Sequence, residues 1–166
     1  MKKEIIASLY DYGVWANEKL LAFAAQLNDE QFNRRLSQGY QSIHDTLAHL
    51  ASADWRWFAR WRDATPLPAM LTGADLPTLD AISAKWAELI PQRCAYIESL
   101  SETQLDETIV WARERETQTL PRWQAMLTCA NHGTQHRSEI AAMLTDMGRS
   151  PGNLDYVYYC REKPKP

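Results

Sequence analysis

The amino-acid sequence predicts an all-α protein, a bundle of four helices with a short β-hairpin or extended excursion before the fourth. Two observations lead to this prediction. Apolar residues recur at intervals of three and four over four long stretches, the spacing that gives a helix one apolar face. The connections between these stretches are modest in length, so consecutive helices can pack around one core. We therefore expect a single domain over residues 1–166, long enough to bury most of its apolar surface.

The first two helices are bounded by polar residues. The first runs from Lys2 to about Leu27, where a polar stretch interrupts the pattern. The second begins near Ser42, a good N-cap residue, with Asp45 three positions later as a variant of the capping box. It continues to about Asp63, where a proline-containing loop begins.

The third helix contains a proline. It starts at about Pro77 and continues to Leu100 with an apolar stripe along its length. Pro91 lies inside this stretch, where it removes a backbone hydrogen bond and its ring crowds the preceding turn. We therefore expect a kink at Pro91.

A change of period marks the segment before the fourth helix. Thr108–Trp111 and Thr117–Leu120 flank the charged residues 113–115, and this pattern predicts a short hairpin. The fourth helix then begins with Pro121 in its first turn and ends at Gly148, with a proline just beyond.

Composition and charge argue against several classes of partner. The net charge is −3 and the basic residues are not gathered on one segment, whereas nucleic-acid binders carry a basic footprint for phosphates. Arg56, Arg60 and Arg62 lie close together, and we interpret them as the solvated face of a helix. No apolar run is long enough to span a membrane, and the first residues do not form a secretory signal. We expect a cytoplasmic protein that binds neither nucleic acid nor a membrane.

Two of the four histidines stand four positions apart in the predicted fourth helix. His132 and His136 are separated by about 400° of rotation, so their rings lie roughly 40° apart on one face and can reach one ion. Gly133 occupies the position at which the HExxH proteases carry a glutamate base, so that mechanism is excluded. The apolar stripe of the helix passes close to this face, so the two rings should point into or beside the core.

A third ligand must come from another helix, and His49 in the second helix is the candidate. The alternative is that His49 is a core histidine satisfied by hydrogen bonds, and the spacing alone leaves both interpretations open. His44 is about 140° away from His49 around the helix, so we interpret it as a residue of the helix start and not as a ligand.

The three cysteines, Cys94, Cys129 and Cys160, are widely spaced and form no CxxC pair, so we expect reduced, packed thiols. Cys129 lies one turn before His132, and a position close to the metal site is a second interpretation.

Four segments, which together span nearly the whole chain, carry a family resemblance: YGVWANEKL at 12–20, SIHDTLAHL at 42–50, HGTQHRSEI at 132–140 and GRSP at 148–151. In this order and at these distances they resemble the DinB/YfiT-like superfamily of bacterial proteins, which are regarded as metalloenzymes. The family is named for induction by DNA damage, which implies a stress-related role, and it is unrelated to the polymerase that shares the name.

The resemblance implies a four-helix bundle, commonly homodimeric, in which three histidines bind nickel or zinc. The family's ligands fall on His49, His132 and His136, so all three are present in this chain. Members of the superfamily include thiol transferases and isomerases that use bacillithiol, mycothiol or glutathione. The resemblance therefore implies one divalent ion and a low-molecular-weight thiol as co-substrate.

Three imidazole ligands leave coordination positions open to water or substrate, as in catalytic metal sites. Glu139 and Gln135 lie on the same stripe as the ligands and are the candidate catalytic residues, with Glu139 orienting a ring or acting as a base. Asp45, one turn from His49, is a further candidate for orienting a ring. The competing interpretation of Glu139 is an ion pair with Arg137 or another surface charge.

Three functions fit this sequence. The first is a metal-dependent enzyme, a transferase, isomerase or hydrolase, that acts on a small electrophile with a thiol co-substrate. The second is a metal-binding bundle with a structural, regulatory or stress-related role and no catalysis. The third is a helical interaction protein whose histidines pack without a metal.

Overall fold

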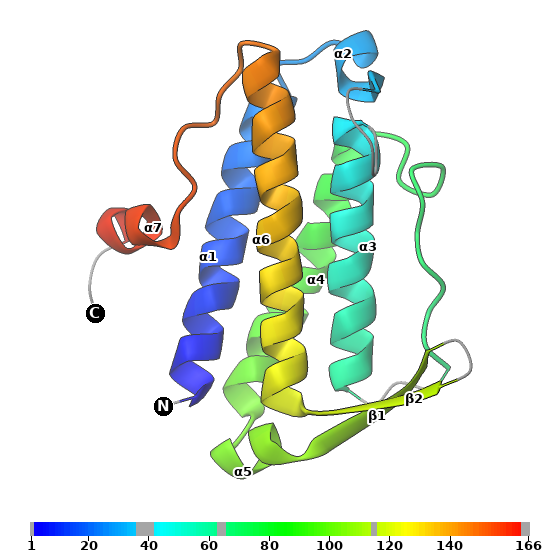
Figure 1. Ribbon diagram of the computed structural model, residues 1–166, viewed down its shortest axis with the longest axis vertical. Coiled ribbons are helices and arrows are strands. Elements are labelled where there is room, and N and C mark those ends of the chain that lie inside the picture. The colour runs from blue at the N-terminus through cyan, green and yellow to red at the C-terminus, as the bar shows by residue number, and fades with distance from the viewer. Residues whose placement is uncertain (1, 36–41, 63–65, 114–115, 164–166) are drawn as a thin grey trace.

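The computed structural model describes residues 2–35, 42–62, 66–113 and 116–163. Four long helices run side by side (Figure 1): α1 (Lys2–Ala24), α3 (Ile43–Trp61), α4 (Leu79–Ser99) and α6 (Arg122–Asp146). The described residues also form three short helices and one pair of strands: α2 (Asp29–Asn33), α5 (Glu102–Asp106), α7 (Tyr156–Glu162), β1 (Thr108–Arg113) and β2 (Glu116–Pro121). The predicted all-α bundle with one hairpin is confirmed.

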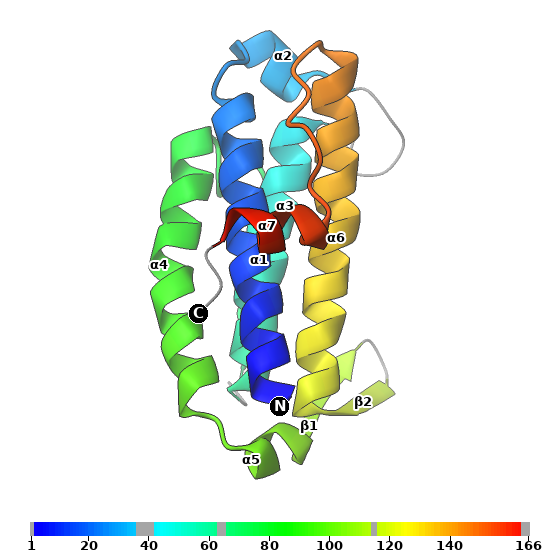
Figure 2. The ribbon, with the colours of Figure 1, turned by 90° about the vertical axis from the view of Figure 1, so that its left-hand side faces the viewer.

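Each long helix packs against two others, α6 against α1 and α3, and α4 against the same two. Figure 2, which views the bundle from the side, shows α4 and α6 on opposite sides of α1. The main apolar core between them includes Leu20, Leu47, Leu50, Ile82 and Ile140, all almost completely buried. None of the described helices is both long and apolar enough to cross a membrane.

The start of α3 is fixed by side-chain hydrogen bonds. The Ser42 hydroxyl accepts a hydrogen bond from the backbone N–H of Asp45 at 3.0 Å, which confirms the predicted N-cap. The Asp45 carboxylate in turn accepts from the Ser42 hydroxyl at 2.8 Å. Helix α3 ends at Trp61, and residue 63, the expected end, lies outside the described residues.

The other helix ends agree closely with the sequence pattern. Helix α1 ends at Ala24, slightly before the expected Leu27, and Thr78 caps the start of α4. Helix α4 continues through Pro91, while the expected kink stays a prediction. Helix α6 stops just before Gly148, whose φ of 72° lies in the left-handed region that glycine enters without strain.

The three short helices were not expected from the sequence. Helices α2 and α5 each begin with a complete capping box, formed by Asn28 with Gln31 and by Ser101 with Gln104. Helix α7 lies across α1 (Figure 2), where Glu162 accepts a hydrogen bond from the Trp15 indole at 2.8 Å. The capping boxes were present in the sequence, but each stretch is too short to show an apolar period.

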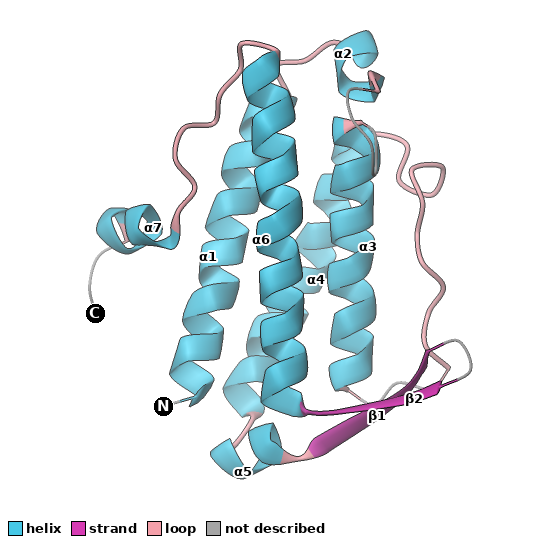
Figure 3. Cartoon of the chain, viewed as in Figure 1, coloured by secondary structure: helices cyan, strands magenta, loops and turns pink. Residues whose placement is uncertain are grey.

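The predicted hairpin is present, with Thr108 paired to Pro121 and Arg113 to Glu116. Figure 3 shows it crossing the end of the bundle beside the start of α6. Ile109 is buried in the core, and the Trp111 ring lies 5.7 Å from the Trp57 ring of α3. Residues 114 and 115 of the expected charged turn lie outside the described residues. The hairpin thus brings a strand against the α3 face that carries Trp57.

A charged pair is buried inside the bundle. Asp54 of α3 accepts hydrogen bonds from the Arg93 guanidinium at 3.3 Å and from the Trp86 indole at 3.1 Å, both on α4. The Cys129 thiol of α6 donates to the same carboxyl group at 3.5 Å. Asp54 therefore links three of the four long helices through polar contacts in the core.

We predict that Asp54→Ala strongly destabilises the protein, because it leaves the Arg93 guanidinium buried without its counter-charge. Loss of one partner of a buried pair costs about 3–5 kcal/mol, which is measurable as a lower free energy of unfolding in urea. The matched control is Asp106→Ala, which breaks an exposed ion pair with Lys2 and should change stability little. An Asp54→Ala loss no larger than the control's would contradict the assigned role.

Candidate metal centre

The three predicted ligand histidines meet between α3 and α6. His49 projects from the middle of α3, and His132 and His136 project from successive turns of α6. The Nε2 atom of His132 lies 3.4 Å from that of His49 and 3.2 Å from that of His136. One ligand atom from each residue lies within 4.8 Å of the other two. The residues that sequence reasoning singled out therefore form one cluster that could bind a metal ion.

The spacing of these atoms fits a common ion. Two nitrogen ligands about 2.1 Å from a tetrahedral metal lie about 3.4 Å apart, close to the two observed Nε2 separations. The surroundings also suit a metal ion. His49 and His132 are only partly exposed, and His136 is buried. Three imidazoles this close together repel one another when protonated, whereas a shared cation binds their lone pairs.

Glu139 fixes the ring of His136. Its carboxylate oxygen lies 2.7 Å from His136 Nδ1, so Nδ1 donates the proton and Nε2 presents its lone pair to the cluster. The Gln135 amide donates to the other Glu139 oxygen at 3.4 Å. Glu139 was considered either as a group that orients a histidine ring or as the partner of a surface charge such as Arg137. The structure shows it in contact with the His136 ring.

The competing partner, Arg137, points elsewhere. Its guanidinium donates to the Thr134 hydroxyl at 3.1 Å and lies over the Tyr12 ring, 5.2 Å from its centre. A Cβ atom on Gly133 would approach this guanidinium to 2.7 Å, so the glycine makes room for it. Gly133, which stands where the HExxH proteases carry their glutamate, therefore has a packing role in α6.

Burial and the neighbouring rings favour the neutral form of His49 and His132 by lowering the pKa of each. Desolvation, followed by the nearby charges of His136 and His132, lowers the pKa of His49 from 6.5 to about 4. Desolvation and His136 also lower the pKa of His132. Neutral rings are the form that binds a metal ion, so the lowered pKa values of His49 and His132 favour metal binding by these two residues at neutral pH.

Two other candidates for a place at the site lie away from it. Asp45, considered as a group that orients His49, instead accepts the Ser42 hydroxyl at the start of α3. The Cys129 thiol contacts Asp54 in the core, and burial raises its pKa well above the ordinary value. The expectation that Cys129 is a packed, reduced thiol holds, and its alternative place at the metal site is wrong.

His44 also lies outside the cluster, as predicted from its angle around the helix. Its Nε2 atom is 2.7 Å from the carbonyl oxygen of Leu76, in the loop before α4. Its ring lies 5.2 Å from that of Phe32 in α2. His44 therefore joins the loop and α2 to the start of α3.

A pocket of about 560 Å³ opens beside the histidine cluster. His49 and His132 line it, together with side chains that sequence reasoning did not assign to a site: Arg56, Trp57, Arg60 and Trp111. Arg56 and Arg60, interpreted from the sequence as part of a solvated face, are partly buried and line this pocket, whereas Arg62 is exposed. Only the packing of the hairpin and α6 against α3 creates the pocket, and no local sequence signal shows it.

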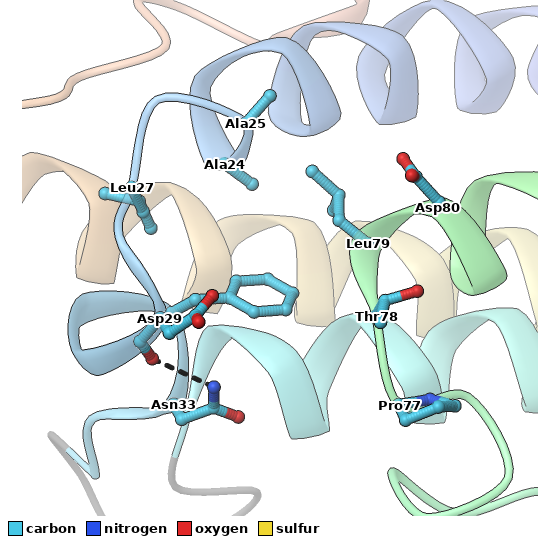
Figure 4. A pocket seen from close by; sticks show the side chains of 10 residues that line it. Ala24, Ala25, Leu27, Asp29, Asn33, Pro77, Thr78, Leu79 and Asp80 are labelled. Carbon is cyan, nitrogen blue, oxygen red and sulfur yellow. Dashed lines mark hydrogen bonds between the residues drawn. The ribbon is translucent and has the colours of Figure 1, made fainter.

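A second pocket, of about 480 Å³, lies at the opposite end of the bundle between α1, α2 and α4 (Figure 4). Its wall includes Leu27, Asp29 and Leu79, and Asn33 donates to the backbone oxygen of Asp29 at 2.9 Å. No histidine lines it among the described residues. The pocket at the histidine cluster therefore combines space with ligand-binding groups.

Comparisons with known proteins agree with this arrangement. The model of a family described as the DinB family matches residues 1–165. The chain belongs to the DinB family. It is 24% identical over 165 residues to Protein DinB of Bacillus subtilis (strain 168), with 91% of each chain covered. The family resemblance is thereby confirmed, and this DinB-family chain carries the histidine cluster on α3 and α6, which pack against each other.

We predict that Glu139→Gln weakens metal binding by about 10–100-fold, the usual effect of removing a carboxylate that orients a ligand imidazole. The affinity is measured by competition with a chromophoric chelator. The control, Glu88→Gln, removes a carboxylate that pairs with Lys85 on α4, and should leave the affinity unchanged. Equal affinities for the two variants would show that Glu139 does not orient His136.

We also predict that the metal-free protein loses stability as the pH falls from 6.5 towards 4. In this range the unfolded chain protonates His49 but the folded chain does not, so the free energy of unfolding decreases with falling pH. Urea unfolding of chelator-treated protein at several pH values gives the slope. His49→Gln should make this slope shallower than in the wild type. An equal slope in His49→Gln and wild type would contradict this origin.

Proposed function

We propose that His49, His132 and His136 bind one divalent ion, zinc or nickel, and that the protein is a metal-dependent enzyme acting on a small electrophile. The reaction is a thiol-dependent S-transfer or isomerisation. One observation carries this proposal: three imidazoles lie close enough to share one ion, and two of them, His49 and His132, line a pocket large enough for a small molecule.

When bound, the ion would lower the pKa of a thiol, so that thiolate is available at neutral pH. In an S-transfer, the thiol loses its proton, the sulfur forms a bond to carbon, and the leaving group departs with its electron pair. In an isomerisation, the thiolate adds to a double bond and is eliminated after rotation, so the thiol is regenerated.

The chain's own residues support this chemistry in distinct ways. Glu139 holds the ring of His136, and Gln135 donates to Glu139, so both position a ligand. The Glu139 side chain is 43% exposed, so it can also pass a proton to solvent. We propose these as the roles of the two candidate catalytic residues.

The main alternative is a metal-binding bundle without catalysis. A structural zinc site usually has four protein ligands, whereas the cluster in the described residues has three. An open position beside a pocket favours the enzyme. From charge and composition we further propose a cytoplasmic protein that binds neither nucleic acid nor a membrane. From the family resemblance we propose a homodimer with a stress-related role.

The turnover of a model electrophile tests the enzymatic proposal. With metal-loaded protein, consumption of monochlorobimane should be faster than the uncatalysed reaction with at least one of bacillithiol, mycothiol and glutathione. Chelation or His49→Ala should reduce the rate to the uncatalysed level, because the ligand set is broken. His44→Gln, a histidine outside the cluster, should keep full activity.

Bound metal in the wild type with no metal-dependent turnover for any thiol would contradict the enzymatic proposal and favour the non-catalytic bundle. Equal rates for wild type and His49→Ala would show that the catalysis does not depend on this site.

A further inference from the structure

The pocket beside the histidines is strongly basic, although the whole chain carries a net charge of −3. Arg56 and Arg60 contribute two positive charges to its wall, and a bound divalent ion would add two more. No aspartate or glutamate lines the pocket among the described residues. A concave site with charges of one sign concentrates ligands of the opposite sign. The pocket therefore favours an anion.

Arg56 is placed to bind a ligand that also reaches the metal. It follows His49 by seven residues, so the two side chains project from the same face of α3, about 10 Å apart along the helix axis. Ala53 stands between them on this face and its small side chain leaves the pocket open. A molecule that lies along α3 in this pocket can therefore contact His49 with one end and Arg56 with the other.

The charge of Arg56 is not compensated within the described part of the chain. None of the salt bridges formed by described residues includes it. Its Nε atom is buried without a hydrogen-bond partner among these residues. Partly buried charged groups normally have a partner, and one that lacks it is a candidate for ligand binding.

Aromatic rings form the wall next to this arginine. The guanidinium of Arg60 lies over the Trp57 ring, 4.7 Å from its centre. The edge of one indole meets the face of the other in the pair Trp57 and Trp111, at 5.7 Å and 71°. These contacts hold the two indoles in place as a rigid apolar surface.

We propose that the pocket selects a small molecule with a carboxylate at one end, and that Arg56 is the specificity-determining residue that binds this carboxylate. The planar guanidinium matches a carboxylate with two parallel hydrogen bonds. Trp57 and Trp111 pack against the apolar middle of the molecule, and its other end reaches the histidine cluster. This inference rests on the proposed function, because that cluster is taken to hold the ion.

A matched pair of thiols tests the inference. Mercaptohexanoate and mercaptohexanol have the same chain, long enough to span much of the distance from the metal to Arg56, and differ only in the carboxylate. Calorimetric titration of the cobalt-substituted protein measures the affinity for each, and the near-ultraviolet thiolate-to-cobalt absorption reports whether sulfur reaches the metal. We expect mercaptohexanoate to bind about tenfold more tightly, as for one charge-assisted pair.

Arg56→Gln should remove this preference by weakening mercaptohexanoate alone, while the affinity for mercaptohexanol stays the same. The control, Arg62→Gln, changes the net charge equally at an exposed arginine that lies over Phe58 and should keep the preference. Far-ultraviolet circular dichroism and the thiolate band with mercaptohexanol show that each variant is folded with its metal in place.

The possible failures are distinct. Equal affinity of the wild type for the two thiols, or a preference that survives Arg56→Gln, overturns the inference while leaving the metal site intact. Absence of the thiolate band with both thiols shows that sulfur does not reach the metal, and contradicts the proposed function itself. A preference for mercaptohexanoate that is lost equally in Arg56→Gln and Arg62→Gln overturns the specific role of Arg56 and indicates a general charge effect.

Discussion

The packing of α3 against α6 is the constraint on which the candidate site depends. His49 is 83 residues from His132 in the chain, and only this packing brings their ring nitrogens to 3.4 Å. Buried apolar side chains on both helices drive the contact, and the bond from Cys129 to Asp54 adds a polar link inside the core. The geometry of the site thus depends on two packed helices, and side chains on such elements are positioned more precisely than those on loops.

The long helices could be predicted from the sequence because each has enough turns to show its apolar period. Their ends were visible in capping residues such as Ser42 and Gly148. The short helix α7 could not be predicted in this way, because its position depends on distant contacts such as that between Glu162 and Trp15. Short elements of this kind are fixed by tertiary packing, which a local pattern does not contain.

The histidine cluster and the pocket also differ in how much of each could be predicted from local sequence patterns. His132 and His136 could be paired from helical spacing alone, whereas spacing left His49 open and the family motif selected it. The role of Arg56 could not be predicted, because its position beside Trp111 arises only when the hairpin closes against α3. Local periodicity thus indicated part of the ligand set, and tertiary structure was needed to find the groups that surround a substrate.

The binding of one ion by three imidazoles can be measured by elemental analysis of protein purified without an affinity tag, combined with X-ray absorption at the metal edge. We expect close to one zinc or nickel per chain, with a nitrogen shell at about 2.0–2.1 Å that includes imidazole scattering. Protein without stoichiometric metal, which also fails to take up either ion, would contradict this expectation. So would a shell dominated by sulfur.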